Sequence, residues 1–545
     1  MIEAELQERS GGMGIYLNPK NRMFAMSINS DIYVDKTELI AFTNKFIGKE
    51  RPLIGSSRPR RFGKTMAAKM LAAYYSKGCN SEELFSDLKI SKCSSFKKYL
   101  NKFDVIFMDM RWMYGNALEE LSQKRINGIV PYIQKQVIAE LREEYPDFVP
   151  VDAISLPSVL SNINNRTDKQ FIIIIDEWDC IFREDKNNKT LQEEYVNLLR
   201  GLFKGVPAEI FVALAYITGI LPIKKYGTQS ALNNFREFTM LDPLGMAEYV
   251  GFTEDEVLRL CKEYHVPFDE MQHWYDGYSF DEIGHIYCPN SVVEALNNKK
   301  FRNYWTKTET YELLMTYIAM DFDGLKQKIV DMLSGNRCKI DSGTFQNDMT
   351  SFKSADDIIT LLIHLGYLAY DSEKEEAYIP NGEVRSEMVR AVKADGWNEV
   401  YKAITDSENL MKETWAMDED KVAKMIHDVH TANSSSLVYN NEVSLSSIIM
   451  LAYYSAAKDY TVIRELPTGE GFADMVFIPK RSTDVPAMIV ELKWDKSAEG
   501  AISQIKDKGY VDALKEYKGN LLLVGINYDK KTRVHQCKIE KYEIE

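Results

Sequence analysis

The chain has 545 residues and a net charge of −14, with 45% apolar and 27% charged residues, which indicates a globular protein of about three to four domains. The acidic balance argues against a protein that coats nucleic acid by charge alone, because such binders carry an excess of Lys and Arg. The seven cysteines form no C-x-x-C pair, the first residues lack the apolar stretch of a signal peptide, and no apolar run is long enough to span a bilayer. We therefore expect a cytoplasmic protein with no membrane partner.

Strand-like and helix-like segments alternate between about residues 50 and 220. The expected strands are nearly continuous in apolar residues, as strands buried on both faces are. They cover residues 52–56, 103–110, 171–176 and 210–218, with helices at residues 64–76, 117–144 and 191–203. This alternation predicts an α/β fold whose parallel sheet is covered by helices.

A P-loop-like segment, RPRRFGKT at residues 58–65, follows the first expected strand and begins the first expected helix. Gly63 would let the backbone approach phosphates, Lys64 would reach the β- and γ-phosphates, and Thr65 would ligate Mg²⁺. The general motif G-x-x-x-x-G-K-[ST] has Gly where Arg58 stands, so the match is incomplete. We also expect Arg61 to bind the nucleotide. The alternative is that the arginines of this segment lie on a solvated loop and contact no phosphate.

A second nucleotide-site element is expected at the end of the apolar strand 171–176. Asp176 would hold Mg²⁺ and Glu177 would polarise the attacking water, as in a Walker B element. The alternative is a core strand with polar residues at its exit. Thr218, at the end of the next strand, either senses the γ-phosphate or only terminates that strand. Arg200 is either an arginine finger for a neighbouring subunit or a helix-surface residue.

The chain becomes mostly helical between about residues 240 and 435. An amphipathic helix at residues 354–365 precedes two short strands, which suggests a winged-helix-like unit. The polar stretch TANSSS at residues 431–436 is a linker candidate. The expected domains are therefore residues 1–235, an NTPase-like domain; residues 236–435, a helical region; and residues 437–545, a C-terminal α/β domain.

The C-terminal region places three charged residues on two short apolar strands, at residues 471–477 and 489–493. Asp474 lies on the first strand, and Glu491 and Lys493 lie on the second, 17 and 19 residues further along. Strand periodicity puts Glu491 and Lys493 on one face, and a hairpin would bring Asp474 beside them. Two carboxylates can hold Mg²⁺, and an ammonium group can orient water or stabilise a phosphate. The alternative is an Asp in a turn and a surface ion pair on an edge strand.

Two further residues belong to this candidate site. Glu442 falls on the apolar face of a helix expected at residues 442–457, where Glu is unusual unless it is paired or bound to metal. A second helix, at residues 502–517, carries Gln504 and is followed by a strand at residues 521–526. Lys493 should stay protonated beside the carboxylates, because opposite charges favour its charged form.

Taken together, these motifs resemble a bacterial family of AAA-ATPase-like proteins with a C-terminal PD-(D/E)xK nuclease domain. The resemblance is carried by five segments: YVDKT at 33–37, RPRRFGKT at 58–65, IDEWD at 175–179, WYDGY at 274–278 and YCPNSV at 287–292. The family's own P-loop also lacks the first Gly, so Arg58 is less of an objection. No chemistry is assigned to the segments at 274–278 and 287–292.

The resemblance implies that Asp474 and Glu491 bind the metal and that Lys493 assists the water. It also implies that Glu442 is the first-helix carboxylate and that Gln504, accompanied by Tyr510, supports the site as in one subset of these nucleases. The implied fold is that of the restriction endonucleases.

The leading hypothesis is a protein that binds and hydrolyses ATP and cleaves nucleic acid, DNA rather than RNA, at a site that uses Mg²⁺ or Mn²⁺. Cleavage would be gated by nucleotide, and a homo-oligomer is compatible with the sequence. One alternative is a nucleotide-switched binding protein with a non-cleaving nuclease-like domain. Another is an ATPase-driven remodeller in which that domain is a targeting module. His427 and His430 form an H-x-x-H pair, which we expect to be a surface pair rather than a zinc site because no third ligand is evident nearby.

Overall fold

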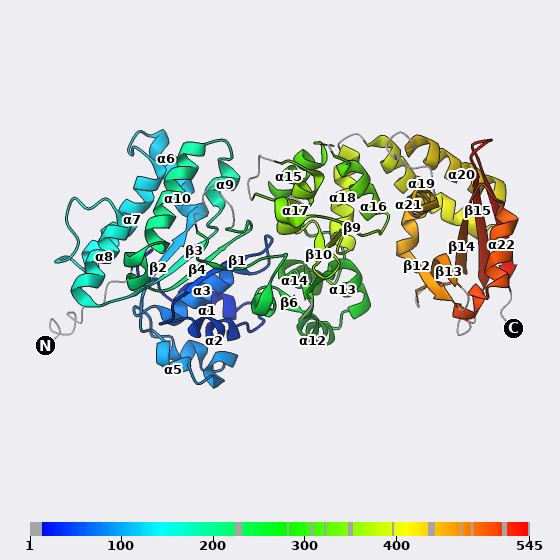
Figure 1. Cartoon of the computed structure of the whole chain (residues 1–545). Helices are drawn as coiled ribbons and strands as arrows, with labels where there is room; N and C mark the ends of the chain where they lie inside the picture. Colours follow the sequence, from blue (N-terminus) through cyan, green and yellow to red (C-terminus); the bar gives the residue numbers. More distant parts are fainter. Residues whose placement is uncertain are drawn as a thin grey trace. The chain divides into compact units, whose positions relative to one another are not determined.

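The computed structural model describes residues 14–223, 232–280, 283–305, 309–320, 323–346, 352–394, 397–433, 442–468, 471–480, 483–514 and 520–542. The chain divides into two compact units, of which the first comprises Met1–Trp305 and Lys339–Val384 and the second comprises Thr306–Cys338 and Arg385–Glu545. The division falls within the short strand β9 (Cys338–Lys339) and within helix α18 (Gly382–Ala394). Figure 1 shows the order of the elements along the chain.

The first unit is built around a five-stranded sheet in which all neighbouring strands run parallel. The strand order is β2-β3-β4-β1-β5. The strands are β1 (Leu53–Ser57), β2 (Asp104–Asp109), β3 (Phe171–Asp176), β4 (Val212–Gly219) and β5 (Arg236–Phe238). Their carboxyl ends meet at one edge of the sheet, where the register places Asp176 beside Asp109 on one side and Thr218 on the other.

Helices cover both faces of this sheet (Figure 1). One face is covered by α6 (Met110–Ser122), α7 (Ile129–Glu144), α8 (Leu156–Thr167) and α10 (Lys189–Phe203). The other is covered by α1 (Arg22–Ile28), α2 (Glu38–Asn44), α3 (Lys64–Tyr75) and α5 (Phe96–Tyr99). Along β3, Ile173 and Ile175 pack on the first side, whereas Ile172 and Ile174 pack on the second. This two-sided burial explains why the strand is apolar at every position.

Three sequence expectations for this unit need correction. The helix expected at residues 117–144 is two helices, α6 and α7, because Pro131 has no amide proton and is tolerated only in the first turn of a new helix. Residues 210–211, expected in a strand, end the short helix α11 (Val206–Phe211). Helix α8 and the edge strand β5 were not expected.

The first unit continues with a smaller sheet and helices. Strands β6 (Phe252–Thr253), β8 (Gly284–Tyr287) and β7 (Tyr278–Phe280) form an antiparallel sheet in that order. It packs with α12 (Glu254–Tyr264), α13 (Phe268–Tyr275) and α14 (Pro289–Asn298). Helix α17 (Ala355–Leu365) then precedes a hairpin of β10 (Ala369–Asp371) and β11 (Glu376–Tyr378). The expected helix followed by two short strands is thus present.

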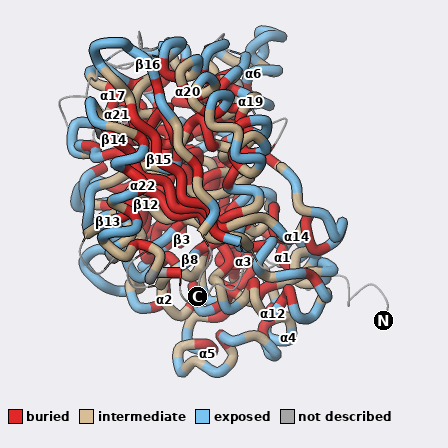
Figure 2. The backbone as a smooth tube through the Cα atoms, turned by 90° about the vertical axis from the view of Figure 1, so that its right-hand side faces the viewer, coloured by how far each residue is buried: buried red, intermediate tan, exposed pale blue. Residues whose placement is uncertain are grey.

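The second unit contains a five-stranded mixed sheet in the order β12-β13-β14-β15-β16. Its strands are β12 (Tyr460–Thr468), β13 (Gly471–Pro479), β14 (Ala487–Trp494), β15 (Leu521–Asp529) and β16 (Val534–Tyr542). Only the β14–β15 pair is parallel. Figure 2 shows that the central strands β14 and β15 are buried along most of their length.

Helices also cover both faces of this second sheet. Helices α19 (Asn398–Trp415), α20 (Glu419–Asn433) and α21 (Glu442–Ala452) pack on one face, and α22 (Ala498–Asp507) packs on the other. The unit also contains α15 (Glu309–Ile318) and α16 (Leu325–Leu333). Two α/β units, one with a parallel sheet and one with a mixed sheet, confirm the expected fold class.

The helix ends in this unit differ from the sequence expectations. The helix expected at residues 442–457 stops at Ala452 and is followed by a 3₁₀ turn, and α22 ends at Asp507 rather than near residue 517. Residues 431–433 of the expected linker belong to α20, and residues 434–436 lie outside the described residues. No helix in the described part of the chain is both long and apolar enough to cross a membrane.

Candidate functional site

The P-loop segment joins β1 to α3, and Gly63 takes a left-handed conformation (φ +95°) directly before the helix. A Cβ at this position would meet no heavy atom within 4 Å, so the glycine is needed for the backbone conformation rather than for packing. Lys64 is buried, and its Nζ donates to the Pro59 carbonyl at 2.9 Å and lies 3.9 Å from a carboxylate oxygen of Glu177. Burial lowers the pKa of Lys64, and the charges of Glu177 and Asp176 oppose that shift.

Asp176 ends β3 beside the first turn of α3. The pKa of Asp176 is raised to about 6 because the carboxyl group is buried. A hydrogen bond from the side chain of Thr65 opposes this rise without cancelling it. The structure therefore brings Thr65 and Asp176 together, as Mg²⁺ ligation by both would require. The hydroxyl of Thr218, beside Asp176 in the sheet register, is buried and has no hydrogen-bond partner among the described residues.

Glu177 is held by an arginine that the sequence reasoning did not identify. Arg183, on helix α9 (Cys180–Glu184), donates from Nη2 to Glu177 and from Nε to Asp179 at 3.1 Å. Asp179 is fully buried and also accepts from the backbone amides of Ile220 and Leu221. Glu177 has a positive φ of +53°, a conformation that is rare outside Gly, Asn and Asp and that often occurs at functional sites.

The arginines of the P-loop segment have other partners. Arg58 is fully buried rather than solvated, and its Nη1 donates to the carbonyls of Phe238 and Thr239, at the end of β5. It therefore connects β1 to the edge strand at the position where the general motif has Gly. Arg61 is exposed and donates to the Tyr304 carbonyl at 2.6 Å. Arg200 donates to Asn197 on its own helix.

The nuclease-like residues converge in the second unit. Strands β13 and β14 form the expected antiparallel pair, and Asp474 accepts a hydrogen bond from the Leu492 amide at 2.7 Å. Lys493 Nζ donates to Glu491 Oε1 at 2.8 Å, as their common strand face requires. Gln504, on α22, also donates to Glu491 Oε1 and lies 3.1 Å from the Tyr510 hydroxyl. Four expected site residues and Tyr510 thus lie together.

The two carboxylate oxygens of Glu491 lie in different surroundings. Its Oε1 accepts from Lys493 and Gln504, whereas its Oε2 is buried without a hydrogen-bond partner among the described residues. Burial and the negative charge of Asp474 raise the pKa of Glu491 to about 7. A divalent cation would occupy the free oxygen and relieve the repulsion between the two carboxylates, so these residues fit the implied metal.

Two more residues bear on this site. Glu442 is the first residue of α21, and its side chain lies outside the described residues. Arg464, on β12, was not identified from the sequence. It donates to Ser446 of α21 at 2.8 Å, and its Nε is buried without a partner in the described part of the chain. Burial lowers the pKa of Arg464, and the charges of Glu465, Asp331 and Asp474 oppose that shift. The only sequence signal for it was a charged pair, Arg464 and Glu465, between the apolar residues Ile463 and Leu466.

The expectation that His427 and His430 form a surface pair is wrong for His430. His430 is buried, and its Nδ1 lies 3.0 Å from Nε2 of His535 on β16. His535, the third histidine, lies 105 residues after His430 in the chain, so local spacing could not reveal this contact. Within the described ranges, however, the three histidines do not bring one ligand atom each within 4.8 Å of one another.

Comparison with known proteins agrees with both expected domain types. A family model for a predicted AAA-ATPase matches residues 23–228, and a model of the PD-(D/E)XK nuclease superfamily matches residues 441–538. The chain carries an AAA-ATPase-like domain and a PD-(D/E)XK nuclease superfamily domain. An uncharacterized protein in the vnfD 5′ region of Azotobacter chroococcum mcd 1 is 21% identical over 517 residues, covering 88% of this chain and 90% of that protein. The similarity to this relative therefore extends over nearly the whole of both chains.

Proposed function

We propose that this protein is a Mg²⁺-dependent nuclease coupled to an ATP-binding and ATP-hydrolysing domain. The observation that supports the nuclease most directly is the buried Oε2 of Glu491, which has no hydrogen-bond partner among the described residues and lies beside Asp474 and Lys493. A structural ion pair would need no free carboxylate oxygen, and a buried polar atom without a partner is costly. We expect DNA rather than RNA as the substrate, Mn²⁺ to replace Mg²⁺, and a cytoplasmic location.

The chain's own residues would divide the work of phosphodiester hydrolysis. Asp474 and Glu491 would hold the metal ion, which supplies charge stabilisation and an acidified water when bound. Lys493 would place positive charge beside the scissile phosphate, while Gln504 keeps Glu491 in position. The charge of Asp474 acts on the pKa of Arg464, and the Arg464 Nε, which has no partner among the described residues, could donate to a phosphate oxygen.

The nucleotide site would use Gly63, Lys64 and Thr65 for the phosphates and Mg²⁺, Asp176 for the metal ion and Glu177 for the attacking water. Arg61 would turn from Tyr304 toward the phosphates. Replacement of Glu177 by Gln keeps the shape of the side chain and removes its negative charge. We expect Glu177→Gln to bind ATP within a few-fold of the wild type and to hydrolyse it about 10²- to 10³-fold more slowly.

Nucleotide would gate cleavage through contacts that begin at the P-loop. Arg61 donates to the carbonyl of Tyr304, and the amide of Tyr304 donates to Glu383 in the first turn of α18. Glu383 is buried and also accepts from Ser291, in the YCPNSV segment. Movement of Arg61 toward a phosphate would break the first of these contacts, and the helix that carries Glu383 continues into the residues of the second unit.

The deciding experiment is cleavage of labelled single- and double-stranded DNA and RNA, with Mg²⁺ or Mn²⁺, with and without ATP. Asp474→Ala should abolish cleavage, whereas the matched control Asp484→Ala, an exposed carboxylate in the loop between β13 and β14, should not. Nucleic-acid binding without cleavage by the wild type would instead favour the nucleotide-switched binding protein. ATP turnover stimulated by DNA, again without cleavage, would favour the remodeller.

The gating proposal has its own test. Lys64→Ala should lose ATP binding and the ATP response of cleavage, and Lys69→Ala, on the same helix, should keep both. Cleavage whose rate and ATP response are unchanged in Lys64→Ala, although ATP binding is lost, would disprove the gating.

A further inference from the structure

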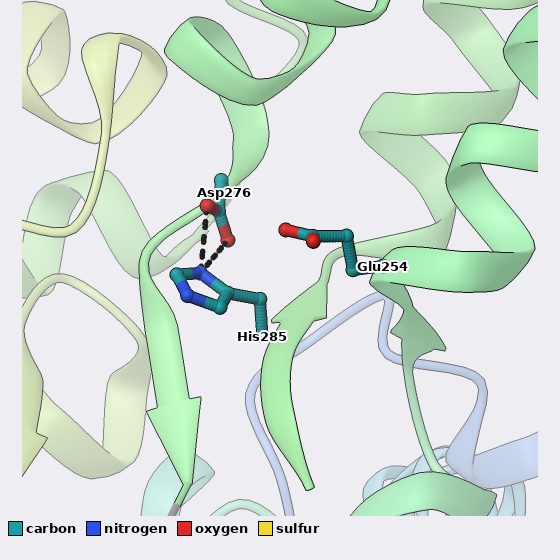
Figure 3. A group of neighbouring side chains, drawn as sticks. All are labelled: Glu254, Asp276 and His285. Carbon is teal, nitrogen blue, oxygen red and sulfur yellow. Dashed lines mark hydrogen bonds and ion pairs between the residues drawn. The ribbon is translucent and has the colours of Figure 1, made fainter.

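A second cluster of ligand-type side chains lies in the first unit, on elements outside the large parallel sheet (Figure 3). Glu254 is the first residue of α12, Asp276 follows the last residue of α13, and His285 lies on β8. One ligand atom from each of the three lies within 4.8 Å of the others. In Figure 3 the Glu254 carboxylate points toward Asp276, and dashed lines join Asp276 to the His285 ring.

Asp276 is fixed by the backbone around it. Its backbone amide donates to the backbone carbonyl of Gln272, in the last turn of α13, and its backbone carbonyl accepts from the side-chain amide of Asn381. The next residue, Gly277, has a φ of +111°, and a Cβ there would lie 2.0 Å from the Pro380 carbonyl oxygen. The Asp-Gly pair of the WYDGY segment therefore has a structural reason: the glycine permits this close approach, which positions the aspartate before it.

Glu254 is not needed to cap α12, because its neighbours do so. Thr253 and Glu256 form the capping box of α12, and Glu256 also accepts from Lys36 Nζ at 2.6 Å. The helix start is thus secured without Glu254. The pairing of β6 with β8 places Thr253 opposite Ile286, which brings the first residue of α12 close to His285.

The distances suit a shared ion. Nδ1 of His285 lies 2.9 and 2.8 Å from the two carboxylate oxygens of Asp276. Two ligand atoms bound at about 2.1 Å to one tetrahedral ion lie about 3.4 Å apart, so a shift of about half an ångström would bring His285 and Asp276 from their hydrogen bond into joint ligation. One imidazole and two carboxylates form a mixed nitrogen and oxygen donor set, which favours Zn²⁺ and similar transition-metal ions over Mg²⁺ and Ca²⁺.

We propose that Glu254, Asp276 and His285 form a binding site for a divalent transition-metal ion such as Zn²⁺, separate from the nucleotide and nuclease sites. The side chain of Asp276 is 11% exposed and that of His285 is 45% exposed, so the site has a buried wall and an open side. The open side leaves coordination positions for water or for a ligand from solution. The ion would bind together the start of α12, the end of α13 and strand β8.

The test uses the full chain with Asp474→Asn and Glu491→Gln as the parent, so that the nuclease site cannot bind metal, and without nucleotide. Co²⁺ binding is followed by visible absorption and Zn²⁺ binding by calorimetry. The parent should bind one ion per chain. Asp276→Asn and His285→Gln should bind it more than about 100-fold more weakly, since even removal of a residue that only supports a ligand costs about 10- to 100-fold.

Control variants separate this site from metal binding elsewhere on the chain. His273→Gln, an exposed histidine on the neighbouring α13, should bind the ion as the parent does. Far-ultraviolet circular dichroism shows whether each variant is folded. Glu254→Gln leaves the capping residues of α12 in place and should weaken metal binding, so it tests the site even if the Asp276 or His285 variant unfolds. The proposal is overturned if the parent binds no Zn²⁺ at millimolar concentration, if the Asp276 and His285 variants bind like the parent, or if only His535→Gln removes the ion.

Discussion

The guanidinium group of Arg183 is hydrogen bonded to the carboxylate of Glu177, the residue that directly follows Asp176, the proposed magnesium ligand. The same guanidinium donates to the fully buried Asp179. The side chain of Arg183 is itself 4% exposed, so one buried guanidinium forms ion pairs with two carboxylates. Loss of the arginine would leave Asp179 as a buried charge supported only by backbone amides.

We therefore expect Arg183→Met to lower the free energy of unfolding by about 3–5 kcal/mol, the usual cost of removing one partner of a buried ion pair. Urea denaturation measures this change. The matched control is Arg200→Met on α10, where the guanidinium is partly exposed and donates to Asn197 of its own helix. It should change stability by less than about 0.5 kcal/mol. Equal effects of the two substitutions would contradict the role given to the Arg183 pair.

Lys493 is expected to act on the phosphate by its charge. Lys493→Ala should reduce the cleavage rate by about 10²- to 10³-fold, the usual loss when one stabilising donor is removed, while substrate affinity changes little. Lys496→Ala, three residues further and exposed, should cleave at the wild-type rate. Single-turnover cleavage at saturating enzyme measures the rate, and a titration of enzyme measures the affinity. Full activity of Lys493→Ala would show that the lysine serves only as a structural partner of Glu491.

The raised pKa of Glu491 makes stability depend on pH. Its folded-state pKa is about 7 against an ordinary value of 4.5, so between these values the folded protein keeps a proton that the unfolded chain releases. The metal-free protein should therefore lose stability as pH rises through this interval. Asp176 and Glu383 have raised pKa values and contribute with the same sign.

Glu491→Gln isolates the contribution of this one carboxyl group. We expect the variant to lose part of the pH dependence of the melting temperature, whereas Glu499→Gln, exposed on α22, should keep all of it. Mg²⁺ should raise the melting temperature of the wild type more at about pH 8 than at about pH 6, because the ion binds the ionised carboxylate. A wild type and a Glu491→Gln variant with identical pH profiles would refute this assignment.

Two glycines near the proposed transition-metal site allow a matched comparison. Gly284→Ala places a Cβ in open space at a φ of +77°, so it should cost only about 1–2 kcal/mol of backbone strain. Gly277→Ala adds a collision with the Pro380 carbonyl at 2.0 Å and should cost about 1–3 kcal/mol more. Chemical denaturation of both variants measures the difference. If Gly277→Ala is no less stable than Gly284→Ala, the packing of Gly277 against Pro380 does not constrain this region.

In the two five-stranded sheets, the strands that the sequence did not predict share one property. Strands β5, β12 and β16 each lie at the edge of a sheet. An edge strand bonds to one neighbour only, and its side chains need not be apolar on both faces, as the alternation of polar and apolar residues in β16 shows. The central strands β3, β14 and β15 are covered on both faces, and their continuous apolar runs were recognised.

Elements whose chemistry is local could be recognised without coordinates. The Gly63–Thr65 turn, the Asp176–Glu177 pair and the spacing of Glu491 and Lys493 follow from the geometry of one turn or one strand. The folded chain was needed to show that Arg183 pairs with Glu177, that Gln504 reaches Glu491, and that Glu254 and His285 meet Asp276. These partners come from separate elements, and their proximity depends on strand order and helix packing, which no local spacing encodes.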